Sequence, residues 1–345
     1  MKINKRKMIS LLSVLLVLVM VFAVGCGGSK APAQNGNANA DDDKVYKFTG
    51  GIQPPATHPT AVSMQKFADL VKEKTNGKVL LTVLPDAQLG GERELLEGVQ
   101  LGTVDFSNIT TTIVANAVPQ YLVFDLPFLF ANDQAVYSYF DSKDGRDLLK
   151  NCEAKNMKGL GYLNNGFRVT SSNIPIKKAD DVKGLSIRTQ ENQLHMATWK
   201  ALGAQPTPLA MQDLYTALQQ GVVGAQENPF SVIASFGLYE IQDYISETNH
   251  INSMTVTMFN KAKWDSIPAK YQDAIMEAWA EVEKYDRGAK EEALKADIAK
   301  MEAAGTTVIR STDIDLNSFK EKVQSVYTQY EGQVGKDLLD SILKR

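Results

Sequence analysis

Hydrophobic residues follow two different spacings along the first third of the chain. Strand-like runs or alternation predict β-strands at residues 45–49, 79–84 and 104–109. Between them, spacings of three and four residues predict a helix from His58-Pro59 to about Asn76-Gly77, and a second helix marked by Leu95 and ended at Gly102. Strands that alternate with helices of these lengths predict an α/β domain with a largely parallel sheet.

The same alternation resumes after Gly159. Strands are predicted at 159–163, 167–171 and 185–188, helices at 193–202 and 211–219, and a short apolar run covers 222–225. A second α/β domain is therefore expected to follow the first. A further strand-like segment at 256–260 is expected to return to the first domain.

A much longer helical pattern occupies residues 268–303. Pro268 suits the first helical turn and Gly305 suits the exit. At 1.5 Å per residue one such helix would be about 50 Å long, which is enough to run along both domains. Two consecutive helices are the alternative, and Gly288 could mark the bend between them.

The start of the chain resembles a targeting segment. Lys2, Lys5, Arg6 and Lys7 precede residues 8–28, which carry no charge. This pattern predicts a signal peptide at residues 1–25, with an uncleaved membrane anchor as the alternative. Residues 26–43 contain no large apolar side chain and are expected to form a flexible tether.

Composition and charge narrow the function. The net charge is −3, or about −7 without the four cations of the signal segment, and no basic stripe indicates nucleic acid. We find no serine-nucleophile elbow, Rossmann glycine cluster or metal-ligand pair, so neither an enzyme nor a cofactor or metal is expected. His58, His195 and His250 lack acidic or Cys neighbours at metal-ligand spacing. Cys152 is interpreted as a small semi-buried residue.

The most informative stretch lies between residues 159 and 230. Arg168 and Arg188 each lie at or beside a strand-like segment, and Asn228 precedes Pro229 after a helical pattern. A guanidinium fork fits the two oxygens of a carboxylate, so these residues are candidate anion ligands. The structural alternatives are an ion pair between domains for Arg188, a hinge role for Arg168 and a turn role for Asn228. Glu227 is expected to hold an arginine in place.

Further polar residues lie near predicted strand ends. Thr110, Thr111 and Thr112 follow one strand, and Asn164-Asn165 follow another, where ligands of open α/β sheets bind. Met211 and Tyr215 are one helical turn apart and could line a cleft or belong to the core. The candidate ligand-binding set is Arg188, Arg168, Asn228, Glu92, Thr111, Met211 and Tyr215.

Several segments, in this order and spacing, resemble the solute-binding proteins of TRAP (tripartite ATP-independent periplasmic) transporters, closest to the C4-dicarboxylate-binding type. The segments are Gln88-Leu89-Gly90, Asp125-Leu126-Pro127-Phe128, Gly166-Phe167-Arg168, Gly184-Leu185-Ser186-Ile187-Arg188, Ala201-Leu202-Gly203-Ala204 and Gln226-Glu227-Asn228-Pro229. Ala23-Val24-Gly25-Cys26 resembles a lipobox, although Ala23 replaces the usual larger aliphatic residue. The resemblance implies the lipoprotein form, with Cys26 lipidated.

The resemblance also implies a fold and a site. It implies an α/β, two-lobed, periplasmic-binding-protein-like fold that closes around an organic acid, with a long helix crossing both lobes. Lobe I would comprise 44–165 plus 254–290, and lobe II 166–253 plus 291–345. Arg188 would make the bidentate carboxylate contact, Arg168 would add a second cation, and Asn228 would donate its amide. One departure is Gly224-Ala225, where the family usually has Asp-Gly.

The function that follows is capture rather than catalysis. An extracytoplasmic protein, lipid-anchored to the bacterial cell membrane and monomeric, would capture a C4-dicarboxylate or similar small organic acid. It would deliver this ligand to the membrane subunits of a TRAP permease. The alternatives are a sugar acid (a uronate or aldonate) as the ligand, or a role as the ligand-sensing subunit of a receptor.

Overall fold

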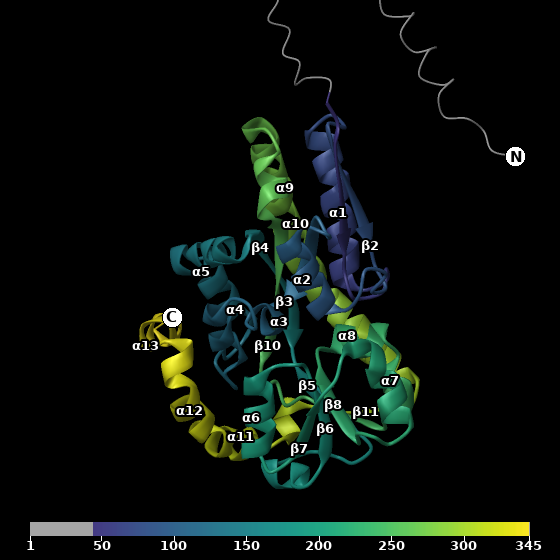
Figure 1. Ribbon diagram of the computed structural model, residues 1–345. Coiled ribbons are helices and arrows are strands. Elements are labelled where there is room, and N and C mark those ends of the chain that lie inside the picture. The colour runs from purple at the N-terminus through teal and green to yellow at the C-terminus, as the bar shows by residue number, and fades with distance from the viewer. Residues whose placement is uncertain (1–43, 345) are drawn as a thin grey trace, which may run out of the picture. The chain divides into compact units, whose positions relative to one another are not determined.

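The structure is a computed structural model that describes residues 44–344 (Figure 1). The expected signal peptide, the tether and the lipidated Cys26 lie outside the described residues. None of the helices between residues 44 and 344 is both long and apolar enough to cross a membrane.

Five strands of the described chain form the first sheet, in the order β2-β1-β3-β10-β4. Their bounds are β1 Tyr46–Gly51, β2 Val79–Leu84, β3 Phe106–Thr110, β4 Met157–Phe167 and β10 Asn252–Asn260. β1 runs parallel to β2 and β3, whereas β10 is antiparallel to both β3 and β4. The predicted return of the 256–260 segment to the first domain is therefore confirmed.

Six strands of the same described region form the second sheet, in the order β11-β9-β5-β8-β6-β7. Their bounds are β5 Val169–Ser172, β6 Ser186–Thr189, β7 Gln205–Pro208, β8 Ala225–Asn228, β9 Tyr244–Ser246 and β11 Thr307–Ile309. β5 is antiparallel to β8 and β9, and the remaining pairs are parallel. Both sheets are thus mixed rather than largely parallel, because β10 in the first sheet and β5 in the second run antiparallel to both of their neighbours.

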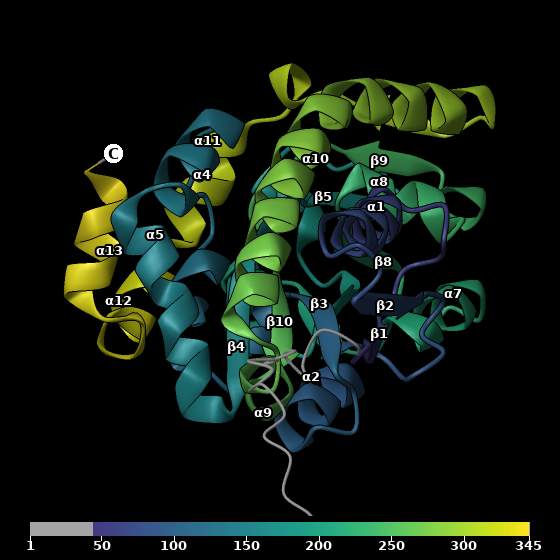
Figure 2. The same cartoon turned by 90° about the horizontal axis from the view of Figure 1, so that it is seen from above.

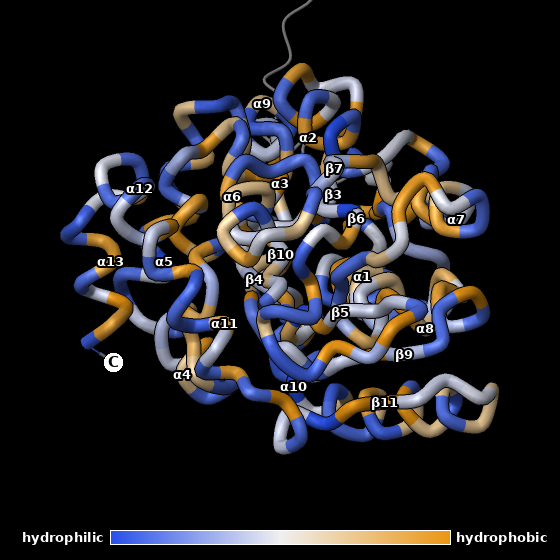
Figure 3. Tube along the Cα trace, turned by 90° about the horizontal axis from the view of Figure 1, so that it is seen from below, coloured by the Kyte–Doolittle hydropathy of each residue, from blue (hydrophilic) through white to orange (hydrophobic). Residues whose placement is uncertain are grey.

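Helices pack against both sheets. The bounds are α1 Pro59–Lys74, α2 Glu92–Leu101, α3 Thr111–Val114, α4 Asp133–Phe140, α5 Lys143–Leu148, α6 Gln193–Ala201, α7 Met211–Gln219, α8 Phe230–Ser235, α9 Lys261–Asp265, α10 Ala269–Ala303, α11 Leu316–Lys322, α12 Gln324–Val334 and α13 Lys336–Leu343. α1 contacts β2, α2 contacts β3 and β10, and α6 contacts β6 and β7. In α13, hydrophobic and hydrophilic positions alternate along the tube (Figure 3), with Leu339 and Ile342 buried.

The chain passes between the sheets at two adjacent segments. Arg168 is the single residue between β4 of the first sheet and β5 of the second. Residues 247–251 lead back from β9 to β10. The Arg168 backbone N–H donates to the Ile251 carbonyl at 2.8 Å, so the two crossover segments are hydrogen-bonded to each other.

The long helical pattern forms one continuous helix, so the alternative of two consecutive helices is wrong. α10 contains 35 residues, and Pro268 precedes its first turn. It contacts α1 and β4 of the first sheet's side, and α8 and β11 of the second. Figure 2 shows it passing beside β4 and β10 before its C-terminal part turns along the second sheet's side. α10 therefore spans both sheets.

Residues 111–156 show no clear periodicity, and the structure explains why. They form short helices and two 3-10 segments, η1 (Pro119–Asp125) and η2 (Leu149–Lys155). Their aromatic side chains pack together in T-shaped, tilted and stacked pairs. Elements of four to eight residues are too short to show a helical hydrophobic period.

Candidate functional site

One cavity of the described chain is lined by residues from the sides of both sheets. The first side contributes His58, Glu92, Thr110 and Ser253, and the second side contributes Arg168, Arg188, Gln190, Met211 and Asn228. Five of the seven candidate ligand-binding residues therefore line one cavity.

The remaining two candidates lie elsewhere. Thr111 is buried, and its hydroxyl donates to the Met254 carbonyl at 3.2 Å, while its neighbour Thr110 lines the cavity instead. Tyr215 packs, partly buried, against a hydrophobic cluster that includes Met211. Periodicity could not show which of Thr110 and Thr111 lines the cavity, because β3 ends at Thr110 and the alternation of side-chain directions ends with it.

Arg168 is held by an acidic partner at the crossover. Its Nε and Nη2 donate to the two carboxylate oxygens of Glu227, and Nη2 also donates to the Asn228 Oδ1 at 3.0 Å. Both Arg168 and Glu227 are fully buried. The prediction that Glu227 holds an arginine in place is confirmed, and the hinge role considered for Arg168 agrees with its position between β4 and β5.

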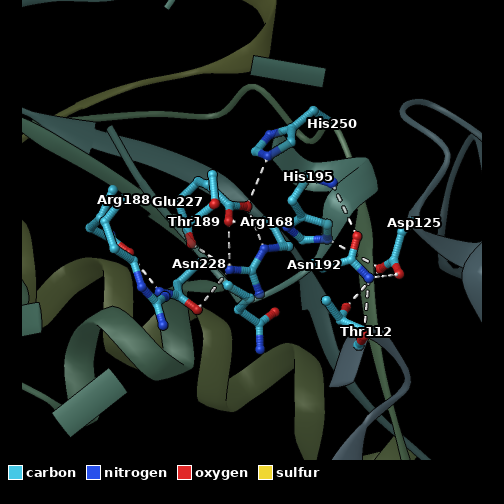
Figure 4. A network of polar contacts seen from close by, with 12 residues as sticks. Thr112, Asp125, Arg168, Arg188, Thr189, Asn192, His195, Glu227, Asn228 and His250 are labelled. Carbon is cyan, nitrogen blue, oxygen red and sulfur yellow. Dashed lines mark hydrogen bonds and ion pairs between the residues drawn. The ribbon is translucent and has the colours of Figure 1, made fainter. Parts of the chain in front are cut away.

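Glu227 is also the centre of a wider buried network (Figure 4). His195 lies between two carboxylates, with Nδ1 3.3 Å from Glu227 Oε1 and Nε2 3.1 Å from Asp125 Oδ1. Burial alone would lower the pKa of His195, but Glu227 and Asp125 outweigh it and raise the pKa. The imidazolium form, in which both ring nitrogens donate, fits this position.

A second histidine approaches Glu227 from the other crossover. His250 Nε2 lies 3.0 Å from Glu227 Oε2, and its Nδ1 lies 2.9 Å from the Thr248 hydroxyl. Burial lowers the pKa of His250, so the neutral ring donates to Glu227. Despite the burial of Glu227, its cationic neighbours Arg168 and His195 hold its pKa well below the usual value.

Sequence reasoning missed this network. Asp125, His195, Glu227 and His250 are separated by up to 70 residues from their partners, and no local motif joins them. Within the described residues, no group of three or more His, Cys, Asp or Glu side chains could hold a metal ion. Trp199 contacts His250 edge-on and is buried.

Arg188 is buried in a different way. Its Nε and Nη2 both donate to the Leu209 carbonyl, at 2.9 and 2.7 Å. Its buried Nη1 has no partner, and no carboxylate pairs with Arg188 within residues 44–344. Burial, with a contribution from nearby Arg168, lowers the pKa of Arg188 to about 10. The edge formed by Nη1 and Nη2 is therefore left to face the cavity.

Asn228 lines the same cavity as the two arginines and is hydrogen-bonded to Arg168. Its Oδ1 accepts from Arg168, and its Nδ2 donates to Gln226 Oε1 at 2.6 Å. Gln226 in turn donates to the Ser171 hydroxyl at 2.7 Å. An amide nitrogen carries two hydrogens, so one Asn228 hydrogen remains for a ligand.

Glu92, which lines the same cavity, is buried at the start of α2. Its Oε1 accepts from the Thr110 N–H at 2.8 Å, and its Oε2 accepts from the Thr110 hydroxyl at 2.7 Å and from Gln190 Nε2 at 3.1 Å. Burial raises the pKa of Glu92, although Thr110, Arg168 and Arg188 all oppose the shift. Gln190 was not foreseen from the sequence.

His58 caps α1, in agreement with the helix start predicted at His58-Pro59, and it lines the same cavity. Its Nδ1 accepts from the Thr60 N–H at 3.1 Å. Burial lowers the pKa of His58 to about 4, so the ring is neutral and its hydrogen is on Nε2. The buried Nε2 has no partner in the described chain.

Comparisons with known proteins agree with this architecture. The family described as bacterial extracellular solute-binding protein, family 7, matches residues 50–333. The 2,3-diketo-L-gulonate-binding periplasmic protein YiaO of Escherichia coli (strain K12) is 33% identical over 297 residues, which is 85% of this chain and 90% of that protein. The C4-dicarboxylate-binding periplasmic protein DctP of Rhodobacter capsulatus is 33% identical over 301 residues, 86% of this chain and 90% of that protein.

A solved structure extends the agreement to three dimensions. A TRAP periplasmic solute-binding protein from Polaromonas sp. JS666, bound to D-erythronate, matches with a TM-score of 0.83 and 33% identity, covering 86% of this chain and 98% of that one. The expected α/β two-lobed fold is confirmed by this match. The chain therefore belongs to family 7 of the bacterial extracellular solute-binding proteins, the TRAP transporter components that bind solutes and are not enzymes.

Proposed function

We propose that this protein captures a small organic acid in the cavity and delivers it to the membrane subunits of a TRAP permease. The observation that carries the proposal is Arg188, a buried cation whose Nη1 has no partner among the described residues. A buried charge without a partner is costly. A carboxylate bound to the Nη1–Nη2 edge would supply both the counter-charge and two hydrogen bonds.

Neighbouring groups support a carboxylate at this position. Arg168 uses Nε and Nη2 for Glu227 and Asn228, which leaves its Nη1 for a ligand. The second amide hydrogen of Asn228 could reach the same carboxylate. In this proposal Arg188 binds the acid, Arg168 adds positive charge, and Glu92 and Met211 form the remaining walls.

The class of acid has two candidates, a C4-dicarboxylate and a sugar acid. The relatives named above include one of each kind, a C4-dicarboxylate-binding protein and a 2,3-diketo-L-gulonate-binding protein. The structural neighbour holds D-erythronate.

The proposal also covers the state of the protein. We expect a monomeric, extracytoplasmic protein that is attached to the membrane through lipidated Cys26. Its two lobes would comprise residues 44–165 plus 254–290 and residues 166–253 plus 291–345.

Calorimetric titration of the protein tests the carboxylate site. Each acid of a panel of C4-dicarboxylates, aldonates, uronates and keto acids is compared with its neutral amide. At least one acid is expected to bind, and its amide is expected to bind about 100-fold more weakly because two charge-assisted hydrogen bonds are lost. If no acid binds, or if an amide binds as tightly as its acid, the proposed carboxylate site is wrong. Loss of uptake of the bound acid on gene deletion tests delivery to a permease.

A further inference from the structure

The charged side chains that line the cavity are equal in number for the two signs, although none of the carboxylates described in residues 44–344 is paired with Arg188. The charged residues that line it, within the described chain, are three arginines and three glutamates: Arg93, Arg168, Arg188, Glu92, Glu94 and Glu191. Arg168 is also neutralised from behind by Glu227. One ligand carboxylate could pair with Arg188. The other buried arginine that lines the cavity, Arg168, is already paired with Glu227, so the described lining residues offer no unpaired buried cation for a second carboxylate.

The cavity wall that includes Arg168 and Arg188 also presents an acceptor, Glu92. Its position is fixed by Thr110, which donates from both its N–H and its hydroxyl. A ligand whose carboxylate binds the arginines would therefore share the cavity with the Glu92 carboxylate, which accepts but does not donate hydrogen bonds.

Gln190 extends the row of acceptors. Its Nε2 donates to Glu92 at 3.1 Å and to the Thr110 hydroxyl at 3.2 Å. Because a carboxylate accepts but cannot donate, the amide nitrogen must point at Glu92. This orientation leaves Gln190 Oε1 buried, in the cavity wall and without a donor. A ligand O–H group would satisfy it, whereas a carboxylate could not.

Two further unpaired groups lie on the first sheet's side. The His58 Nε2–H is a buried donor, and the Ser253 hydroxyl is buried without a partner. The cavity thus offers donors and acceptors together. A hydroxyl group both donates and accepts, so it can pair with either kind, while a second carboxylate can pair only with the donors.

We propose that the cavity selects a monocarboxylate that carries hydroxyl groups over a dicarboxylate. Glu92 and Gln190 would accept from the ligand hydroxyls, and His58 would donate to one of them. This inference rests on the proposed function, since it requires the carboxylate to bind at Arg188. It assigns the ligand to the aldonate class of hydroxy acids.

Two matched sets of acids test the inference by calorimetry on the unmodified protein. The four-carbon set is D-erythronate, succinate and butyrate, and the six-carbon set is galactonate, galactarate and hexanoate. Within at least one set, the hydroxylated monocarboxylate is expected to bind about 10- to 100-fold more tightly than the other two acids. Galactonate and galactarate are the sharpest pair, because they differ only in the second carboxylate.

The Glu92→Gln variant tests whether the negative charge of Glu92 contributes to this preference. The amide removes the negative charge and is expected to narrow the preference for monocarboxylate over dicarboxylate by about tenfold. Glu97→Gln is the matched control, because Glu97 is exposed on the same helix and does not line the cavity. Its ligand preference is expected to stay unchanged.

The outcomes separate this inference from the function on which it rests. A dicarboxylate that binds the unmodified protein as tightly as the matching hydroxy monocarboxylate would overturn the inference and leave acid capture intact. The same holds if butyrate or hexanoate binds as tightly as its hydroxylated counterpart. If no acid of either set, or of the wider panel, binds, acid capture itself is overturned. The result with the unmodified protein does not depend on whether Glu92→Gln folds.

Discussion

Arg168 and Arg188 line the same cavity and are almost equally buried, with 1% and 2% of their surface exposed. Arg168 is surrounded by Glu227, a backbone carbonyl and Asn228. Among the residues that the structure describes, Arg188 has only the Leu209 carbonyl as a hydrogen-bond partner. The positive charge of Arg168 is therefore compensated by Glu227, whereas that of Arg188 has no paired carboxylate among residues 44–344.

In the proposed function, this difference separates a structural role for Arg168 from a ligand-binding role for Arg188. Arg168 lies at the crossover between the sheets, where Glu227 also meets His195 and His250. Its positive charge offsets the buried negative charge of Glu227 even in the absence of ligand. In the proposed site, the Nη1 of Arg188 would be paired only when an anion is bound. Removing partners in the two regions should therefore change different measurable quantities.

The largest effect is expected from Glu227→Gln. The change leaves Arg168 and His195 buried without their shared carboxylate, which should lower the free energy of unfolding by about 3–5 kcal/mol. Urea unfolding measures it. Glu247→Gln is the control, because Glu247 pairs with the more exposed Arg310 and should cost at most about 1 kcal/mol. Equal stability of the two variants would contradict the structural role of the Arg168 region.

Arg188→Lys should act on binding rather than on stability. A lysine keeps the charge but cannot form the guanidinium fork, so affinity for the acid should fall about 100-fold. Calorimetry with the tightest acid measures this loss. The control Arg310→Lys changes an arginine away from the cavity and should leave affinity unchanged. Unchanged affinity in Arg188→Lys would remove Arg188 from the site.

The Arg168 region should also make stability depend on pH. The pKa of His195 is raised in the folded protein, so its contribution is complete below the unfolded value of about 6.5 and is lost as pH rises through the folded value. For each tenfold gain in the proton affinity of this ring on folding, the contribution is about 1.4 kcal/mol. Urea unfolding above pH 6.5 should show a decline that His195→Gln reduces. The same slope in both proteins would show that His195 is not charged there.

The smallest effect is expected at the departure from the family pattern. A side chain at Gly224 would first meet Ser186 atoms at 3.5 Å, which is ordinary contact. Gly224→Asp should therefore change both stability and acid affinity by less than about 0.5 kcal/mol, as for most surface changes. Thermal unfolding and calorimetry check this expectation. A large loss of affinity would show that this turn takes part in holding Asn228.

Much of the secondary structure was predictable from local spacing. The predicted strand at 79–84 and the helix at 211–219 match β2 and α7 to the residue. Short elements were missed, because a helix of four to eight residues shows no clear period. Five cavity residues were identified in advance, whereas Gln190 and Ser253 carry no motif and were found only from the folded chain.

The sequence by itself determined the succession of strands and helices and the presence of two arginines suited to a carboxylate. It could do so because periodicity and residue chemistry are properties of neighbouring positions. Only the tertiary structure decided which arginine is paired. Glu227 meets Arg168 across 59 residues and His195 across 32. Those contacts depend on how β5 pairs with β8 and on where α6 packs, and neither is encoded in a local pattern.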